Sequence, residues 1–450
     1  MARSTHTTSI GEAVYPLRLT TVNKGNTLGF ALFIILSGVL FFRPAEWVPE
    51  LIGLPIYHVV IIACMFASFP VLVQQLVLTN LSTHPITVGV LGMLISIILS
   101  HIAQMDLFTA RYEGIQFLKN VVFYLLLVGL LDSADRIQQF LHWMLIFIAF
   151  LIGLSLLDWH NVIDFTFIDS ANAGRLQAVG LFNNPNDLSH ILTFGIIIAL
   201  HILTGGTSRI TRFLAIFPLA LFLYAMVLTK SRGGFLGLIA AWLFFFQARF
   251  GTAKALIFCT ALTPLVIIFF TGRQTDIDFA DSGDTAYARL MLWAEAFGML
   301  KENLFFGIGS NKFSDLMRLV THNSFIQAFV ELGFFGGTIF TGLYVLPIYV
   351  LNSKLMRCNL KNRHADLFRM RALLLSFTFG YITCMMASTR TYLVLSYIVP
   401  GLATALSNVM VRRLRYPPPV LNIKLLSRIV MASLLTFIAI RVFVKYYVRF

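Results

Sequence analysis

Long runs of apolar residues, separated by short polar segments, fill most of the chain after residue 27. An α-helix needs about 20 apolar residues to cross the hydrocarbon core of a bilayer, because each residue adds only about 1.5 Å. The pattern therefore predicts an all-α fold, a polytopic membrane helix bundle of about 12 transmembrane helices with long extracytoplasmic loops. The predicted spans cover residues 28–42, 54–78, 86–103, 117–131, 139–157, 188–203, 210–228, 234–247, 253–271, 323–351, 371–387 and 391–410.

The two ends of the chain carry further apolar signals. The first run, 28–42, is followed by Arg43 and Pro44 without a small-residue cleavage site, so we expect a retained helix and not a signal peptide. A short thirteenth run, 429–440, precedes basic residues, and we expect it to lie at the cytoplasmic face. No internal repeat or low-complexity tract divides the sequence, which predicts a single integral membrane domain over residues 1–450.

The distribution of basic residues orients the predicted bundle. With the N-terminus inside, 19 of the 34 Lys and Arg side chains fall in inner segments, 12 in outer loops and 3 beyond residue 440. Cytoplasmic loops of membrane proteins carry an excess of Lys and Arg. We therefore expect the segments 352–371 and 411–428 to be cytoplasmic, and residues 272–322 to form the main extracytoplasmic loop. A second long outer loop covers residues 158–187, and long loops on one face often carry function.

The composition indicates a protein embedded in lipid and excludes several classes of function. Hydrophobic residues make up 58% of the sequence and charged residues 12%, against about 25% charged in a typical soluble domain. In a membrane protein the net charge of +14 does not indicate a nucleic-acid partner, because Lys and Arg gather in cytoplasmic loops. The four cysteines lack zinc spacing, and there is no Walker loop, GxGxxG or HExxH motif. We therefore expect no nucleotide or zinc chemistry and no cofactor.

A tight turn on the predicted outer face carries two cations, in the segment Lys230-Ser231-Arg232-Gly233-Gly234. The guanidinium of Arg232 can hold phosphate oxygens in a bidentate fork, and Lys230 adds a second positive charge. The two glycines permit a sharp turn and close approach of the backbone. The alternative is that the arginine reaches up to lipid headgroups.

Two more arginines are candidates for the same outer surface. Arg175 precedes Asn183-Asn184-Pro185-Asn186, which is typical of a capped turn entering a helix. Arg289 has Trp293 one turn later, within the amphipathic stretch Tyr287–Leu300 of the main outer loop. The alternatives are a plain loop cation beside a helix cap for Arg175, and a solvated helix face for Arg289.

His322 and Asn323 lie where the polar outer loop meets the apolar run 323–351. An imidazole has its pKa near the working pH, so His322 can act as general base on a hydroxyl group. The alternative is a helix-start histidine bonded to the backbone. Glu331, nine residues after His322, lies inside the apolar run, where it either pairs with a cation in the protein interior or occupies a polar crevice. Gly333 follows Glu331 closely.

A group of aspartates in the main outer loop resembles a metal site at first sight: Asp276, Asp278, Asp281 and Asp284. Their spacing does not fit a calcium-binding loop, and no glutamate occupies the closing position. Carboxylates on a polar outer loop are adequately explained by solvation alone. We therefore expect a solvated acidic loop and no metal site.

These segments, taken in order, resemble the O-antigen ligase and O-antigen polymerase superfamily of integral-membrane glycosyltransferases. The resemblance covers roughly residues 170–345, and its most specific part is a His-Asn pair followed after nine residues by Gly-x-x-Gly. One difference is Leu304, where the family commonly has proline. The matching elements are Gly174-Arg175 through Asn186, Ser231 to Gly234, Arg289 with Trp293, Asn303 to Gly309, and His322-Asn323 with Gly333 and Gly336.

The resemblance implies a metal-independent enzyme of the bacterial plasma membrane with its active site on the extracytoplasmic (periplasmic) face. It implies that a glycan moves from undecaprenyl diphosphate to a hydroxyl of a glycan or glycolipid acceptor. His322 would deprotonate that acceptor. Arg175 and Arg232, with Arg289 as a weaker candidate, would bind the diphosphate and offset charge on the leaving group. Asn186, Lys230, Asn323 and Glu331 would support these residues.

Several functions remain open at the level of sequence. A ligase would place the glycan on lipid A core, a polymerase on another carrier-linked repeat, and a protein O-oligosaccharyltransferase on a serine. We favour a ligase or polymerase, because no extra soluble C-terminal domain for a protein acceptor is present. A secondary transporter is the competing class, but transporters tend to contain two matching halves, which this sequence does not show by eye. A structural scaffold would leave the arginines and the histidine unexplained.

Overall fold

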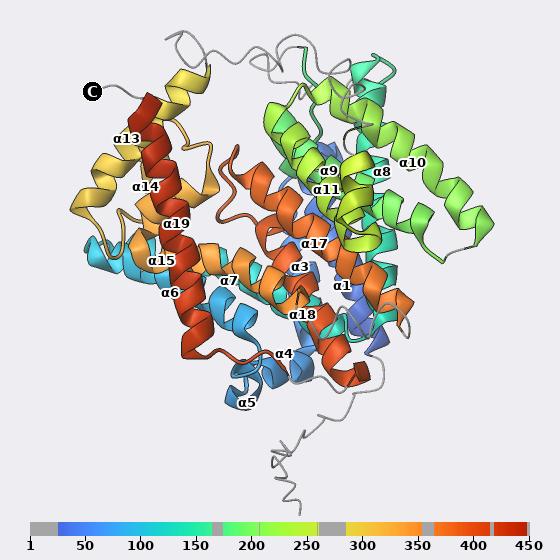
Figure 1. Cartoon of the computed structure of the whole chain (residues 1–450), viewed down its shortest axis with the longest axis horizontal. Helices are drawn as coiled ribbons and strands as arrows, with labels where there is room; N and C mark the ends of the chain where they lie inside the picture. The colour runs from blue at the N-terminus through green and yellow to red at the C-terminus, as the bar shows by residue number, and fades with distance from the viewer. Residues whose placement is uncertain are drawn as a thin grey trace, which may run out of the picture.

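A computed structural model describes residues 26–163, 174–206, 208–258, 260, 285–352, 364–414 and 418–447. Within these residues the fold is all-α, a polytopic membrane helix bundle, as the hydropathy pattern predicted (Figure 1). The N-terminal half contains α1 (Thr27–Phe42), α2 (Pro44–Trp47), η1 (Pro49–Leu51), α3 (Ile56–Ala67), α4 (Phe69–Leu76), α5 (Leu78–Leu81), α6 (Pro85–Ala103), α7 (Leu107–Leu130) and α8 (Ala134–Trp159). The second half contains η3 (Gly180–Phe182), α9 (Pro185–Thr204), α10 (Arg209–Thr229), α11 (Arg232–Phe250), α13 (Thr285–Glu302), α14 (Lys312–Met317), α15 (Ser324–Leu351), α17 (Ala365–Met385), α18 (Leu395–Leu414) and α19 (Ile423–Tyr447).

The number of spans is lower in the described residues than the twelve predicted. Eight helices are long and apolar enough to cross a membrane, and a ninth span results if α3 and α4, bent by 75°, count as one. The helix α1 has only 16 residues, and the polar start of α17 contains Arg369 and Arg371. Most of the predicted span 253–271 lies outside the described residues, so the total of twelve stays a prediction.

The helix α9 forms the centre of the bundle. It is the most enclosed of the candidate spans, with 83% of its apolar window buried, and it packs against α8, α10, α11 and α17. The helices α11 and α17 approach each other closely through small residues, since a Cβ on Gly237 would lie 2.2 Å from Cys384 Sγ. Small residues at such crossings let helices pack by van der Waals contact where lipid supplies no hydrophobic drive.

The helix α15 contains a break that explains two of the sequence motifs. Gly333 has φ 65° and ψ −168°, outside the helical region, so the hydrogen-bond ladder is interrupted there. The preceding segment, Asn303–Gly309, fills the gap: Ile308 and Gly309 donate backbone N–H groups to α15 carbonyls. In return, α15 donates the N–H groups of Phe334 and Phe335 to the carbonyls of Leu304 and Phe305.

Glycine is required on both sides of this contact. A Cβ on Gly333 would lie 2.3 Å from the Phe305 carbonyl carbon, and a Cβ on Gly307 would lie 2.4 Å from the Glu331 carbonyl carbon. Both glycines also have positive φ, which disfavours any residue with a Cβ. The Asn303–Gly309 element and Gly333 are therefore two halves of one backbone-to-backbone contact.

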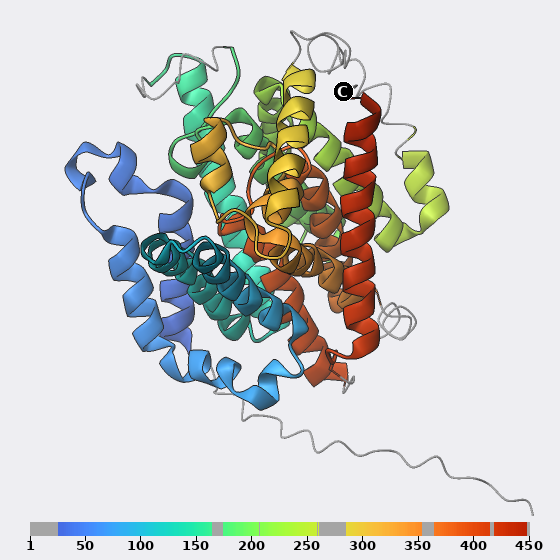
Figure 2. The same cartoon turned by 90° about the vertical axis from the view of Figure 1, so that its left-hand side faces the viewer.

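The expected placement of residues 429–440 at the cytoplasmic face is wrong. They belong to α19, a 25-residue helix that qualifies as a candidate span. Its middle contacts α15, where Thr338 and Ser433 share a 3.0 Å hydrogen bond, and Phe437 packs against Phe297 of α13. Figures 1 and 2 both show α19 running beside α15 and α13. A helix that begins near the predicted inner segment and reaches α13, part of the predicted outer loop, extends through the bundle.

We expect Lys445 to be accessible from outside the cell, on the same side as Glu302. The test is cysteine labelling of intact cells with a membrane-impermeant maleimide, using Glu302→Cys, Lys424→Cys and Lys445→Cys, since all three side chains are exposed. Glu302→Cys and Lys445→Cys should react, whereas Lys424→Cys should react only after lysis. Labelling of Lys424→Cys in intact cells would contradict the orientation, and failure of Lys445→Cys alone would contradict the span formed by α19.

Candidate active site

The loop before α9 brings Arg175 and Asn186 together. Asn184 caps α9 by accepting a 2.9 Å hydrogen bond from the Asn186 N–H, which confirms the predicted capped turn. Arg175 donates from Nε to the Thr229 carbonyl at 3.0 Å and from Nη2 to Asn186 Oδ1 at 3.1 Å. The arginine therefore joins the end of α10 to the start of α9.

The turn between α10 and α11 carries two more cations, Lys230 and Arg232. Lys230 ends α10 in the left-handed conformation, and its exposed ammonium lies about 4.0 Å from the position of a Cβ on Gly174. Ser231 caps α11 and donates a 2.9 Å hydrogen bond to Asn186 Oδ1. Arg232, half-buried, is the first residue of α11. Arg175 and Lys230 thus lie close together where α10 ends and α9 begins, and Arg232 follows in the first turn of α11.

Glycines in this turn hold the helices close enough for that gathering. A Cβ on Gly234 would lie 1.9 Å from Ser189 Oγ of α9, and a Cβ on Gly233 would lie 2.4 Å from Ala387 Cβ. The start of α11 therefore touches both α9 and the segment that follows α17. The glycine pair serves close packing, in addition to the turn that the sequence suggested.

His322 lies at the start of α15, next to a capping asparagine. Asn323 is buried, and its side chain accepts hydrogen bonds from the N–H groups of Phe325 at 3.0 Å and Ile326 at 3.2 Å. His322 adopts φ 51°, a left-handed conformation that is uncommon for a residue with a Cβ. Such backbone strain is frequent at functional sites, because the surrounding structure must impose it.

The amphipathic stretch of the predicted outer loop packs against the His322 segment. It forms α13, as the pattern predicted, and Trp293 Nε1 donates a 2.6 Å hydrogen bond to the Thr321 carbonyl. Burial, and to a smaller extent the positive charge of Arg289, lower the pKa of His322 to about 4. The imidazole is therefore neutral at physiological pH, in the form that can accept a proton.

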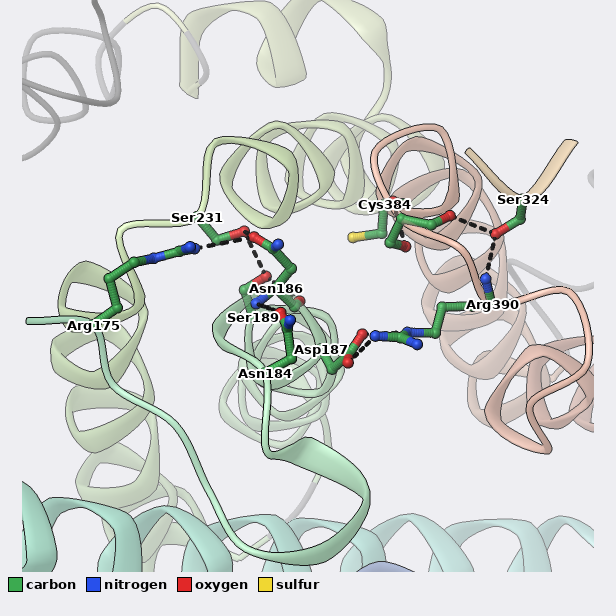
Figure 3. A network of polar contacts seen from close by, with 10 residues as sticks. Arg175, Asn184, Asn186, Asp187, Ser189, Ser231, Ser324, Cys384 and Arg390 are labelled. Atoms are coloured by element: carbon green, nitrogen blue, oxygen red, sulfur yellow. Dashed lines mark hydrogen bonds and ion pairs between the residues drawn. The ribbon is translucent and has the colours of Figure 1, made fainter. Parts of the chain in front are cut away.

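The sequence did not identify Asp187 and Arg390, which connect these parts (Figure 3). Arg390, between α17 and α18, forms a bidentate ion pair with buried Asp187 in the first turn of α9. The backbone N–H of Arg390 also donates a hydrogen bond to Ser324 Oγ at 2.8 Å. Ser324 Oγ in turn donates to the Ser388 carbonyl at 2.7 Å. These contacts link the cation cluster of α9 to the first residue of α15, two positions after His322.

A sequence signal for this link was present. Residues 388–392, Ser-Thr-Arg-Thr-Tyr, form a polar interruption between two apolar runs, and Asp187 directly follows the Asn183–Asn186 segment. Burial lowers the pKa of Arg390 to about 10, so the side chain stays protonated at neutral pH. Removing one partner of such a pair would leave a buried charge uncompensated, which is strongly destabilising.

Glu331 lies apart from the arginines. It is buried in α15, and its carboxylate accepts a 2.7 Å hydrogen bond from the Tyr392 hydroxyl. Two environments were predicted for Glu331, pairing with a cation or a polar crevice, and the hydrogen bond from Tyr392 corresponds to the crevice. The four aspartates between residues 276 and 284 lie outside the described residues, and within the described part of the chain no group of three His, Cys, Asp or Glu side chains could hold a metal ion.

Comparison with known proteins finds a family similarity. The O-antigen ligase family model matches residues 217–341, which include Arg232, Arg289 and His322, whereas Arg175 and Asn186 precede the matched region. No curated protein matches the chain significantly. Residues 217–341 are therefore similar to the O-antigen ligase family, and the helical membrane fold of the described residues agrees with that similarity.

Proposed function

We propose that this protein transfers a glycan from undecaprenyl diphosphate to an acceptor hydroxyl at the periplasmic face of the bacterial inner membrane. The observation that carries the proposal is the bonding of Arg175 and Ser231 to Asn186 at the start of α9, next to the turn that contains Lys230 and Arg232. Asp187 and Arg390 link this part of α9 to the start of α15. The family match supports a glycosyltransferase-type enzyme of the membrane.

The proposed chemistry uses these residues in two roles. His322 accepts the proton of the acceptor hydroxyl while its oxygen attacks the anomeric carbon of the donor glycan. The bond between that carbon and the phosphate oxygen breaks, and undecaprenyl diphosphate leaves with both bonding electrons. Arg175 and Arg232 offset the charge that develops on the diphosphate, with Lys230 beside them and Arg289 nearer to His322.

Arginines at the diphosphate supply the positive charge that a divalent metal ion provides in other transferases. We therefore propose a metal-independent reaction. The leaving group is itself stabilised as an anion, so the transfer needs no transmembrane gradient. Ligase activity on lipid A core and polymerase activity on a second carrier-linked repeat use the same steps, as does transfer to a serine of a protein.

A purified preparation in detergent tests this proposal. With undecaprenyl-diphosphate-linked glycan as donor, and either lipid A core or a carrier-linked repeat as acceptor, we expect transfer without sealed vesicles and an unchanged rate after addition of EDTA. The blank is the same reaction mixture without added lipid-linked donor. Absence of transfer to either acceptor, together with donor movement only in sealed vesicles under a gradient, would replace the proposal with transport. Loss of activity in EDTA would contradict metal independence.

A further inference from the structure

A large cavity lies beside the 174–186 loop, which contributes Leu181 to its wall. Its volume is about 830 Å³, within the range of about 300–1,000 Å³ that small-molecule sites occupy. The lining comes from the end of α1, the start of α3, the first half of α7, Leu181, Asn311 and the segment Tyr392–Val394. Neither Arg175 nor Arg232 contributes to it, so this cavity is distinct from the predicted diphosphate site.

The α7 wall of the cavity is polar on successive turns. Glu113, Gln116, Lys119 and Asn120 line it, although α7 is a candidate membrane span. Polar and charged side chains are costly within a membrane and usually serve a function there. Lys119 Nζ donates a 2.8 Å hydrogen bond to Gln116 Oε1, which uses one of its three N–H groups and leaves donors for an occupant.

The cavity also has aromatic and apolar surface, and Arg43 and His58 add polar groups to the walls outside α7. Tyr57, Tyr112 and Tyr392 line the cavity, together with Phe117 and aliphatic side chains. Tyrosine presents an apolar ring face and a polar hydroxyl. A sugar has the matching chemistry, with apolar C–H faces and a rim of hydroxyl groups that suits amides, carboxylates and ammonium groups. The volume accommodates several sugar rings.

The cavity also connects with the His322 segment. Asn120 Nδ2 donates a 2.6 Å hydrogen bond to the Tyr392 carbonyl, and Asn311 Nδ2 donates a 3.0 Å hydrogen bond to Glu113 Oε2. Tyr392 lies two residues after Arg390, which binds Ser324, and Asn311 belongs to the same outer segment as His322. The Tyr392–Val394 wall of the cavity therefore belongs to the segment that Arg390 bonds to the start of α15.

We propose that this cavity binds the saccharide portion of the acceptor, and that Lys119 and Gln116 determine its recognition. The inference rests on the proposed glycan transfer, because a transferase needs an acceptor site separate from the donor diphosphate. The cation cluster holds the donor diphosphate, and the α7 cavity holds the acceptor sugars.

Direct saccharide binding to the full-length protein in detergent tests this inference without requiring turnover. The probes are the delipidated core oligosaccharide and the released repeat-unit oligosaccharide, measured by saturation-transfer NMR. We expect at least one of them to bind, and Lys119→Met and Gln116→Leu each to weaken its binding about tenfold, as expected for loss of a single hydrogen bond to a charged or amide group. Arg111→Met is the matched control, because Arg111 is an exposed cation on α7 outside the cavity.

The outcomes separate this inference from the proposed function. Equal binding by all variants, or no binding of either oligosaccharide to the wild-type protein, would overturn the acceptor cavity. Lys119-dependent binding of phosphatidylglycerol vesicles, with no oligosaccharide binding, would also overturn it and identify a lipid site. If the wild-type protein transfers glycan while Lys119→Met leaves the acceptor KM unchanged, the transferase stands and the cavity assignment fails. If oligosaccharide binding depends on Lys119 but no transfer occurs, the failure lies with the proposed function.

Discussion

Replacing His322 with glutamine is expected to lower glycan transfer by at least about 100-fold, because a general base contributes about 10²–10⁴ to the rate and an amide cannot take the proton. His322→Asn is the sharper variant. Asparagine tolerates the left-handed backbone that His322 adopts, so the start of α15 should keep its conformation. Initial transfer rates, protein yield and donor binding should be measured together for both variants. His160→Gln is the matched control, since His160 is an exposed histidine that is not one of the candidate active-site residues.

The pH dependence gives a second view of the same residue. Burial and then Arg289 lower the pKa of His322 to about 4, so the neutral, active form predominates near neutrality and is lost as pH falls through about 4. We expect kcat/KM to be flat around neutral pH and to decline below about pH 5. Arg289→Gln removes a charge that lowers this pKa, so the acid limb should move to higher pH. Substantial transfer by well-folded His322→Asn protein would contradict the general-base role of His322. An acid limb at the same pH in Arg289→Gln would contradict the effect of Arg289 on the pKa of His322.

Replacing Arg232 with alanine is expected to lower transfer about 30- to 1,000-fold, because one charge-assisted contact in a preorganised site contributes about 2–4 kcal/mol. Arg232→Lys keeps the charge but loses the planar fork, so it should retain only part of the activity. Arg175→Ala should cause a comparable loss and also reduce protein yield, since Arg175 holds Asn186 and the Thr229 carbonyl. Donor KM and kcat are the measured quantities.

Arg212→Ala is the control for these variants, because Arg212 is an exposed cation at the opposite end of α10 from Lys230. It should transfer glycan at the wild-type rate. Wild-type kinetics in Arg232→Ala and Arg175→Ala, at normal protein levels, would remove both arginines from the mechanism. A loss confined to Arg175→Ala with reduced yield would indicate that Arg175 acts as a structural link alone.

Local sequence predicted those parts of the site that depend on a few consecutive residues. The Asn184 cap of α9, the Asn323 start of α15 and the helical Tyr287–Leu300 stretch all follow from short-range preferences. Arg232 and His322 lie within the region that the family model matches, and their roles stay predictions. Such predictions are reliable because caps and amphipathic faces depend on residues that are close together in the chain.

The sequence by itself determined that this protein is a helical membrane bundle, because 58% hydrophobic residues in long runs leave no other solvent than lipid. It did not determine which helices meet. Arg390 and Asp187 are 203 residues apart, and their pairing depends on how α17 and α18 pack around α9. The sequence pattern predicted only the apolar middle of α19, because basic residues lie near both of its ends. Its contacts with α13 and α15 are seen only in the tertiary structure. Long-range pairing of buried charges and close helix contacts are set by packing, which no local pattern encodes.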